Sequence, residues 1–223
     1  MSTTRPAALP CPALCLVTDR QYARGRPLSD LVSEAVEGGV NIVQLREKDL
    51  AAGELLALAE AIRDVTRKAN ALFLVNDRVD VALAVGADGV ELGEEAMPVA
   101  AVRRIAGRRL LIGRSVHSVD GAREAEAQGA DFLVVGTIFP TRSKPGARTA
   151  GLKQLAQVSQ SVNIPFLAIG GVNATNVAQV MAQGAAGIAV ITAILDSEDP
   201  RKAARELKQA MAAAVRPSAL PAR

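Results

Sequence analysis

Eight short apolar segments of strand length recur along the 223-residue chain, and segments with helical spacing separate them. Strands that alternate with helices in this way predict βα units and a parallel sheet. The apolar segments are 14–18, 40–45, 71–75, 89–92, 110–113, 132–135, 166–169 and 187–191. Eight βα units in a chain of this length fit the α/β class, as a single-domain (β/α)8 barrel of the TIM type.

The segments between the strands carry helix start and stop signals. Helical spacing predicts helices over 54–69, 99–106, 120–128, 152–159, 175–183 and 201–214. Short polar residues stand where helices should begin, at Ser29, at Ser118 with Asp120, and at Asn173. Glycine ends several helices just before a strand, which indicates one βα unit repeated around a closed structure. An open doubly wound sheet is the alternative, but no Gly-x-Gly-x-x-Gly turn follows the first strand.

Composition excludes several classes of partner. The net charge of +3 comes from 26 basic and 23 acidic residues that are interspersed, and aromatic residues make up only 2% of the chain. Nucleic-acid binding is therefore not expected, because a basic block and stacking platforms are both missing. No segment is long and apolar enough to span a bilayer, so we expect no membrane partner and a cytoplasmic location. A homo-oligomer stays open.

The chain is expected to divide into an N-terminal extension, a barrel and a tail. These predicted parts are 1–13, 14–215 and 216–223. Cys11 and Cys15 are the only cysteines, and they lead into the first strand. A redox or metal pair is conceivable, but we interpret them as small residues at a strand start, because no second pair of ligands accompanies them.

The segment from Val40 to Lys48 runs from an apolar strand directly into polar side chains at every second position. Because strand side chains alternate between faces, we expect Val40, Ile42, Gln44, Arg46 and Lys48 to point the same way. Apolar side chains would then line the inner wall of the barrel, followed by an amide and two cations at its mouth. The sequence therefore predicts an anion site at the carboxyl end of the second strand.

Polar residues also follow most of the other strands, at the end where barrels of this type carry their active sites. These residues are Asn76-Asp77-Arg78, Glu91 with Glu94 and Glu95, Arg114 to His117, Thr141 to Gly146, Gly170-Gly171, and Thr192. The paired glycines before a helix suit a phosphate turn, and the hydroxyls and cations of the preceding loop suit phosphate oxygens. With the site near Gln44, this predicts two phosphorylated groups in the ligands.

Two residue types bear on the chemistry at the mouth. His117 is the only histidine, and it is either a general acid or base or a structural residue with satisfied hydrogen bonds. The carboxylates Asp77, Glu94 and Glu95 are oxygen ligands that suit Mg²⁺, and no cluster of His and Cys suits zinc. Glu94 and Glu95 have the alternative of balancing neighbouring cations.

Taken in order, these motifs resemble the thiamine phosphate synthase family over the range from Leu14 to about Val215. The matching pieces are Gln44-Leu45-Arg46-Glu47-Lys48, Asn76-Asp77-Arg78-Val79-Asp80, Gly86-Ala87-Asp88-Gly89-Val90, Phe139-Pro140-Thr141, Ala168-Ile169-Gly170-Gly171 and Ala189-Val190-Ile191-Thr192-Ala193-Ile194. The resemblance implies a transferase of thiamine biosynthesis. Such an enzyme joins 4-amino-2-methylpyrimidine-5-methyl diphosphate to a thiazole phosphate, releases pyrophosphate and forms thiamine phosphate.

The resemblance also implies roles for individual residues. Those expected at the aminopyrimidine diphosphate are Gln44, Arg46, Lys48, Asn76, Ser115 and Lys144. Those expected at the thiazole phosphate are Thr141, Ser143, Gly171, Ile191 and Thr192. Asp77 is expected to bind Mg²⁺. The implied reaction is dissociative, so the site must stabilise charge and hold its substrates in place, and a protein nucleophile is not required.

The chain departs from the family pattern after the fourth strand. Where the family usually reads His-Leu-Gly-Gln-x-Asp, this chain reads Glu91-Leu92-Gly93-Glu94-Glu95-Ala96. The second aspartate that helps to bind magnesium is thus replaced by Ala96, and Glu95 or Glu94 is the candidate to take its place.

Other functions stay open on the sequence alone. The segment around His117 resembles a sister family, the thiazole tautomerases, in which the matching histidine transfers a proton on a thiazole carboxylate phosphate. A non-catalytic protein that binds a phosphate ligand is a further alternative, supported by the loss at Ala96. A phosphosugar isomerase or epimerase is disfavoured, because only one histidine is present. The full set from Gln44 to Asp77 favours the synthase.

Overall fold

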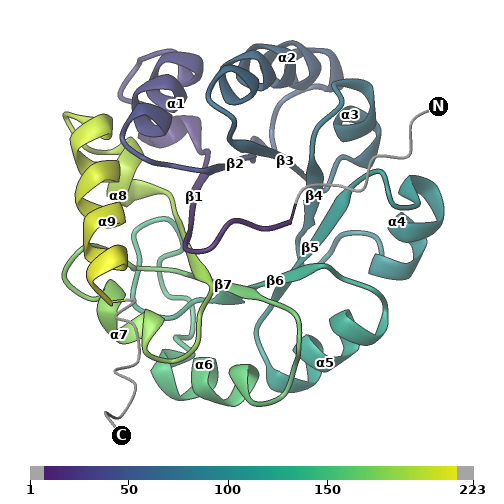
Figure 1. The fold of residues 1–223 in the computed structure, drawn as a ribbon. Coiled ribbons are helices and arrows are strands. Elements are labelled where there is room, and N and C mark those ends of the chain that lie inside the picture. The colour runs from purple at the N-terminus through teal and green to yellow at the C-terminus, as the bar shows by residue number, and fades with distance from the viewer. Residues whose placement is uncertain (1–7, 215–223) are drawn as a thin grey trace, which may run out of the picture.

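A computed structural model describes residues 8–214 of the chain. Within that range the strands form one closed parallel barrel, in the order β1 to β8, with helices around the outside (Figure 1). The strands are β1 (Ala13–Val17), β2 (Ile42–Leu45), β3 (Leu72–Asn76), β4 (Gly89–Leu92), β5 (Leu111–Val116), β6 (Phe132–Gly136), β7 (Phe166–Ile169) and β8 (Gly187–Val190). The predicted (β/α)8 barrel is confirmed.

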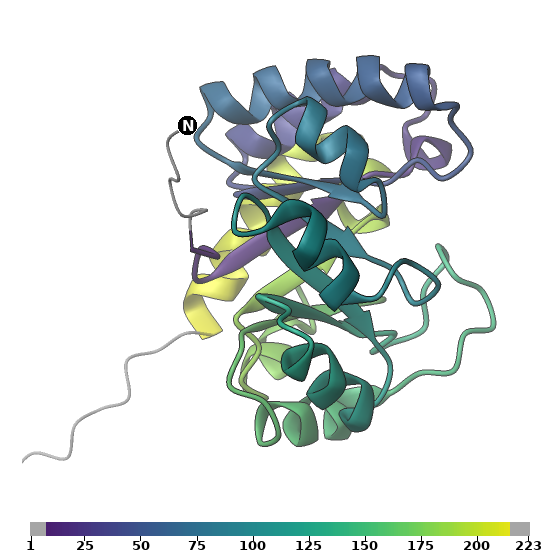
Figure 2. The ribbon, with the colours of Figure 1, turned by 90° about the vertical axis from the view of Figure 1, so that its right-hand side faces the viewer.

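The helices alternate with the strands and cover the outer face of the barrel (Figure 2). They are α1 (Leu28–Glu37), α2 (Ala52–Lys68), α3 (Val79–Ala84), α4 (Val99–Ala106), α5 (Val119–Ala127), α6 (Gly151–Ser159), α7 (Val177–Met181), α8 (Thr192–Leu195) and α9 (Pro200–Ala214), with a short 3-10 turn η1 (Arg20–Tyr22) after β1. None of the helices described for residues 8–214 has both the length and the apolarity needed to cross a bilayer. The predicted tail at 216–223 lies outside the described residues.

Side-chain alternation divides the core into two layers. Inward-facing residues such as Cys15, Ile42 and Phe132 fill the barrel itself. Their chain neighbours, such as Leu16 and Val43, pack outward against the helices. This arrangement is expected where a parallel sheet is buried on both faces. Cys15 is thus an interior side chain of β1, both cysteines are free, and burial raises the pKa of the Cys15 thiol. The interpretation of Cys11 and Cys15 as small residues at a strand start is consistent with this placement.

Some local predictions were wrong. Val40 belongs to the outward layer and β2 begins only at Ile42, because Gly39 turns the chain at φ +112° and the Asn41 side chain accepts from the backbone N–H of Leu14 at 2.8 Å. Ser29 does not cap α1, since that helix already begins at Leu28 after Pro27.

Two other N-cap predictions had different outcomes. Ser118 caps α5 as predicted, by accepting from the backbone N–H of Gly121 at 3.0 Å. Asn173 instead closes a turn onto the backbone N–H of Thr175 at 2.9 Å, so α7 starts later, at Val177, than the sequence indicates.

Barrel closure requires a glycine in β8. A Cβ on Gly187 would lie 2.0 Å from the backbone oxygen of Ala13, its partner in β1. We expect Gly187→Ala to lower the free energy of unfolding by about 3 kcal/mol or more, since a backbone atom cannot rotate away from the clash. Gly53→Ala is the control: it meets nothing within 4 Å in α2. It should raise stability by about 0.5–1 kcal/mol. Urea denaturation of both variants measures the difference, and equal stabilities would contradict this account of closure.

Candidate active site

A cavity of about 600 Å³ opens at the carboxyl ends of the strands, and we call it the mouth. Most of the residues predicted from the sequence line it: Gln44, Arg46, Lys48, Asn76, Asp77, Glu94, Glu95, Ser115, His117, Thr141, Ser143, Lys144 and Ile191. Gly171 and Thr192 line a smaller adjoining cavity of about 30 Å³, which Thr141, Ser143 and Ile191 also line. The structure thus gathers side chains from loops that are distant in sequence.

The floor of the mouth is a hydrogen-bonded network that joins four neighbouring strands, β2 to β5. The Gln44 amide donates from Nε2 to Asn76 Oδ1 at 2.9 Å and to Glu91 Oε2 at 3.0 Å. The Ser115 hydroxyl donates to the other carboxylate oxygen, Glu91 Oε1, at 2.7 Å. Gln44, Asn76 and Glu91 are buried. Because an ionised carboxylate only accepts, it fixes the Gln44 amide with its NH2 group toward the floor, and the Gln44 carbonyl oxygen is left for a ligand.

Glu91 is the functional residue whose role the sequence did not reveal. Its position in β4, at 2% exposure, places a carboxyl group among apolar strands. Burial raises the pKa of the Glu91 carboxyl above its ordinary value, and the charge of Asp77 acts in the same direction, whereas hydrogen bonds from Ser115 and Gln44 oppose the shift. One signal was available in the sequence: Glu91 is a charged residue in a strand whose other residues are apolar or glycine. Ionisable groups held in this way concentrate at functional sites.

The loop after β3 aims Asp77 at the mouth. Asp77 adopts φ +57°, a left-handed conformation that costs a non-glycine residue about 1 kcal/mol or more. Its N–H donates to the Glu91 carbonyl at 2.9 Å, and its Oδ1 accepts from the Gly93 N–H at 2.7 Å. The carboxylate is therefore tied to the loop that carries Glu94 and Glu95. Asp77 is not the N-cap of α3, because Arg78 holds that position.

The rim of the mouth carries positive charge that the protein leaves without a counter-ion. Among residues 8–214, Arg46, Lys48 and Lys144 form no ion pair. Glu47 lies between Arg46 and Lys48 and points to the opposite face of the chain, where it is buried and pairs with Arg20. The alternation predicted beyond Gln44 therefore holds, and the cations face the mouth. Unpaired cations at the rim of a cavity attract anionic ligands.

The turn after β7 provides backbone groups. Gly170 and Gly171 adopt φ +101° and +63°. A Cβ on Gly171 would lie 2.5 Å from the Pro140 carbonyl oxygen, so only glycine permits this close approach of the β6 and β7 loops. The Thr141 and Ser143 hydroxyls lie 3.1 Å apart beside this turn. Hydroxyls next to a glycine turn are suited to phosphate oxygens.

His117 lies at the end of β5, between the mouth and the neighbouring loop. Its Nδ1 is hydrogen-bonded to the Gly136 carbonyl oxygen, and its Nε2 lies 3.4 Å from Glu94 Oε2. Because a carbonyl only accepts, Nδ1 carries a proton. The geometry is therefore compatible with both interpretations of His117, as a structural residue and as a general acid or base.

The donor set at the mouth fits magnesium only together with a ligand. Within residues 8–214, no group of three or more His, Cys, Asp and Glu residues lies close enough to hold a metal ion alone. Mg²⁺, however, is commonly held by one or two carboxylates and by substrate phosphates. Asp77, Glu94 and Glu95 line one cavity with Ala96, so the carboxylates needed for that mode of binding are present.

A (β/α)8 barrel whose strand ends gather cations, hydroxyls and a glycine turn is an enzyme scaffold for phosphorylated substrates. Comparison with known proteins narrows this class. The family model described as thiamine monophosphate synthase matches residues 14–194. The chain belongs to this family, as its resemblance in sequence implied.

The similarity extends over nearly the whole length of individual relatives. A thiamine-phosphate synthase of Pyrococcus furiosus is 47% identical over 196 residues, which are 88% of this chain and 93% of the relative. A thiamine-phosphate synthase of Methanoculleus marisnigri is 48% identical over 202 residues, 90% of this chain and 96% of the relative. The solved structure of a thiamine phosphate pyrophosphorylase from Pyrococcus furiosus superposes with a TM-score of 0.85 at 44% identity, covering 91% of this chain and 96% of that one.

The buried Glu91 carboxyl gives a pH-dependent prediction. The pKa of this carboxyl is higher in the folded than in the unfolded state. Its contribution to the free energy of unfolding is therefore greatest below the unfolded pKa of about 4.3, where the group is protonated in both states. That contribution is lost as the pH rises through the folded-state pKa. We therefore expect Glu91→Gln to raise the melting temperature by a few degrees at pH 8, corresponding to about 1–3 kcal/mol. The gain should vanish toward pH 4.

Calorimetric melting at several pH values measures the effect of Glu91→Gln. Glu95→Gln is the matched control, because Glu95 is exposed and its neutralisation should change stability by less than about 0.5 kcal/mol at any pH. A Glu91→Gln gain that persists unchanged at pH 4 would show that the amide stabilises by packing, not by removal of a buried charge.

Proposed function

We propose that this protein joins an aminopyrimidine methyl diphosphate to a thiazole phosphate, releasing pyrophosphate and forming thiamine phosphate. The observation that carries the proposal is the pairing of two anion sites in one mouth, beside a floor whose polar groups suit a heterocycle. Family membership supports it, because the relatives of similar length are named thiamine-phosphate synthases. Neither tautomerisation nor ligand binding without turnover gains support from them.

In the proposed mode of binding, the pyrimidine ring lies on the floor. The Gln44 carbonyl oxygen, freed by the bond between its NH2 group and Glu91, accepts from the amino group of the ring. Arg46, Lys48 and Lys144 receive the diphosphate at the rim. Thr141, Ser143 and the Gly171 turn receive the thiazole phosphate. These contacts hold the thiazole nitrogen and the pyrimidine methylene carbon together, which replaces a bimolecular encounter by a positioned one.

The reaction then needs charge stabilisation in two places. The bond between the methylene carbon and the diphosphate oxygen breaks, the electron pair leaves with pyrophosphate, and positive charge develops on the pyrimidine. The rim cations stabilise the departing anion, and the buried Glu91 carboxylate lies on the side where positive charge develops. The thiazole nitrogen donates its lone pair to the carbon, and thiamine phosphate forms. Bound Mg²⁺, held by Asp77 and by Glu95 or Glu94, would neutralise diphosphate charge.

We propose a cytoplasmic protein acting on small molecules, without nucleic-acid or membrane partners. A homo-oligomer stays a prediction.

The direct test supplies both substrates with Mg²⁺ and follows thiamine phosphate and pyrophosphate. We expect turnover by the unaltered protein. Arg46→Ala should reduce kcat/KM for the aminopyrimidine diphosphate by about 100-fold, because an interaction with developing charge is worth about 3 kcal/mol. Arg104→Ala, an exposed change on α4 outside the mouth, should leave the rate unchanged. A folded protein that forms no product overturns the proposal.

Ala96 allows the metal site to be tested by adding a ligand. Since Ala96 and Asp77 line the same cavity, we expect Ala96→Asp to lower the Mg²⁺ concentration for half-maximal activity by about threefold to tenfold, through a further carboxylate. Ala96→Asn adds the same volume without charge and should not. Asp77→Asn should raise the Mg²⁺ requirement about tenfold or more.

Glu94→Gln and Glu95→Gln show which glutamate contributes to the metal site. The same activity titration against Mg²⁺ serves for both variants. A requirement for Mg²⁺ that is unaltered in both would exclude them as ligands, and an Ala96→Asp protein with unchanged dependence would place the metal elsewhere.

A further inference from the structure

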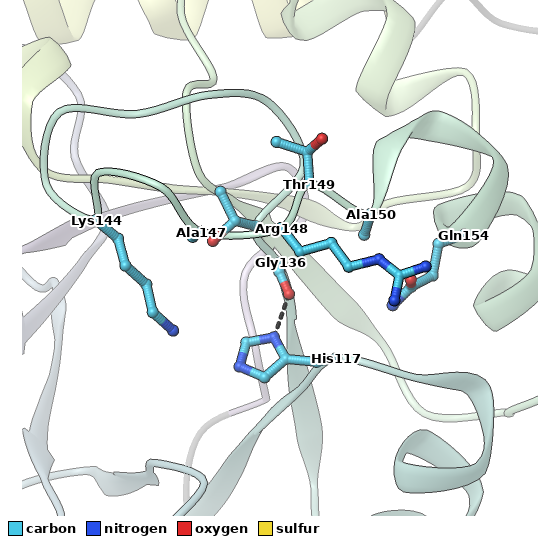
Figure 3. Close-up of a pocket in the computed structure, with 9 residues that line it drawn as sticks. His117, Gly136, Lys144, Ala147, Arg148, Thr149, Ala150 and Gln154 are labelled. Carbon is cyan, nitrogen blue, oxygen red and sulfur yellow. Dashed lines mark hydrogen bonds between the residues drawn. The ribbon is translucent and has the colours of Figure 1, made fainter.

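A second cavity of about 570 Å³ lies next to the mouth, under the long loop between β6 and α6 (Figure 3). We call it the side pocket. The residues that line it are His117, Gly136, Thr137, Lys144, Ala147, Arg148, Thr149, Ala150 and Gln154. His117, Thr137 and Lys144 also line the mouth, whereas Arg148 and Gln154 do not. The side pocket is therefore a separate space that shares one wall with the proposed active site.

The charge of the side pocket has one sign. Lys144 and Arg148 are cations that form no ion pair with any residue in the range 8–214. Arg142 in the same loop differs, because it pairs with Asp196 at the end of α8. No Asp or Glu belongs to the described lining. Figure 3 shows Lys144 and Arg148 reaching to either side of the His117 ring.

An unpaired donor points to a missing ligand. Gln154 Nε2 is buried and has no hydrogen-bond partner among the described residues. A buried polar group without a partner costs about 1–3 kcal/mol, so native structures rarely leave one unexplained. Arg148 and Gln154 line the same cavity, and Figure 3 labels both side chains there. An anion between these two side chains would satisfy the Gln154 amide and neutralise the guanidinium together.

His117 forms part of the wall shared by the mouth and the side pocket. Its bond to the Gly136 carbonyl fixes the ring at one nitrogen and leaves Nε2 on the side of Glu94. The ring lines both cavities. It is also the only histidine of the chain, so its imidazole signals in an NMR spectrum need no assignment.

From the cavity, its unpaired cations and the orphaned Gln154 donor, we propose that the side pocket is a third anion site, in addition to the two in the mouth, and that it binds inorganic diphosphate. Guanidinium, ammonium, amide and hydroxyl groups are the donors that phosphoryl oxygens prefer. This inference rests on the proposed function, because the proposed reaction releases diphosphate from the pyrimidine and so supplies the ligand. Lys144 lines both cavities, and it therefore connects the place where diphosphate is released to the side pocket.

The test weakens anion binding in the mouth, so that anion binding in the side pocket can be measured separately. Inorganic pyrophosphate is titrated into the Arg46→Ala protein, without Mg²⁺ or other substrates, and the His117 imidazole signals are followed by NMR. We expect a saturable shift. The dissociation constant should rise at least tenfold when Arg148→Ala or Gln154→Leu is added to Arg46→Ala. Adding Arg104→Ala, which removes the same charge from α4 outside both cavities, should leave it unchanged.

Three results would overturn the proposal. One is the loss of all pyrophosphate binding in Arg46→Ala; another is residual binding that is insensitive to both Arg148→Ala and Gln154→Leu. The third is orthophosphate binding as tightly as pyrophosphate, because the pocket would then be a general phosphate site. The free-state His117 signals show whether each variant keeps the native environment. The synthase assay tests the proposed function separately. If the protein shows no turnover but gives the expected titration, the anion site in the side pocket stands and the proposed function fails. If the protein is active but the titration gives one of the three results above, only the anion site fails.

Discussion

The buried contact between Gln44 and Glu91 is the constraint on which the mouth depends. These two polar side chains lie at inward positions in a barrel whose interior is otherwise mostly apolar, and their hydrogen bond offsets part of the cost of burying each of them. The carboxylate accepts, the amide must donate, and the orientation of the amide follows. Asn76 and Ser115 complete the network from the neighbouring strands. A rigid polar floor results, at a cost in stability that burial of a carboxyl group implies.

The sequence predicted the parts of the structure that follow from periodicity. Alternation along β2 and its extension correctly placed Gln44 on the inner face with Arg46 and Lys48 beyond it, and the eight apolar segments correctly predicted the closed barrel. Resemblance to the synthase family was confirmed by the family match. The roles assigned to individual side chains and to Mg²⁺ stay predictions, because lining a cavity does not show what a residue binds.

What the sequence could not give depends on contacts between distant segments. Val40 precedes Ile42 by two residues, so alternation assigned it to the inner face. The turn at Gly39 places Val40 outside the strand, in the outward layer, because the regular alternation begins only at Ile42. Asp77 has a left-handed backbone, and its side chain accepts a hydrogen bond from the Gly93 N–H, 16 residues further along. The side pocket brings together β5, β6 and α6, so neither Arg148 nor Gln154 carried a local signal.

The distribution of charge along the barrel axis favours ligation over the alternatives. Exposure increases from the buried Gln44 through the half-buried Arg46 to the exposed Lys48, so the Glu91 carboxyl lies at the floor and the unpaired cations lie at the rim. The exposed carboxylates Glu94 and Glu95, the candidate Mg²⁺ ligands, also lie at the rim. A bond that breaks into a cationic heterocycle and an anionic diphosphate has its charges separated along the same direction. Because the protein dipoles are fixed before the reaction, the developing charges meet groups that need no reorganisation. Proton transfer on a thiazole carboxylate phosphate would not require this separation, since it breaks no bond to a diphosphate and generates no heterocyclic cation.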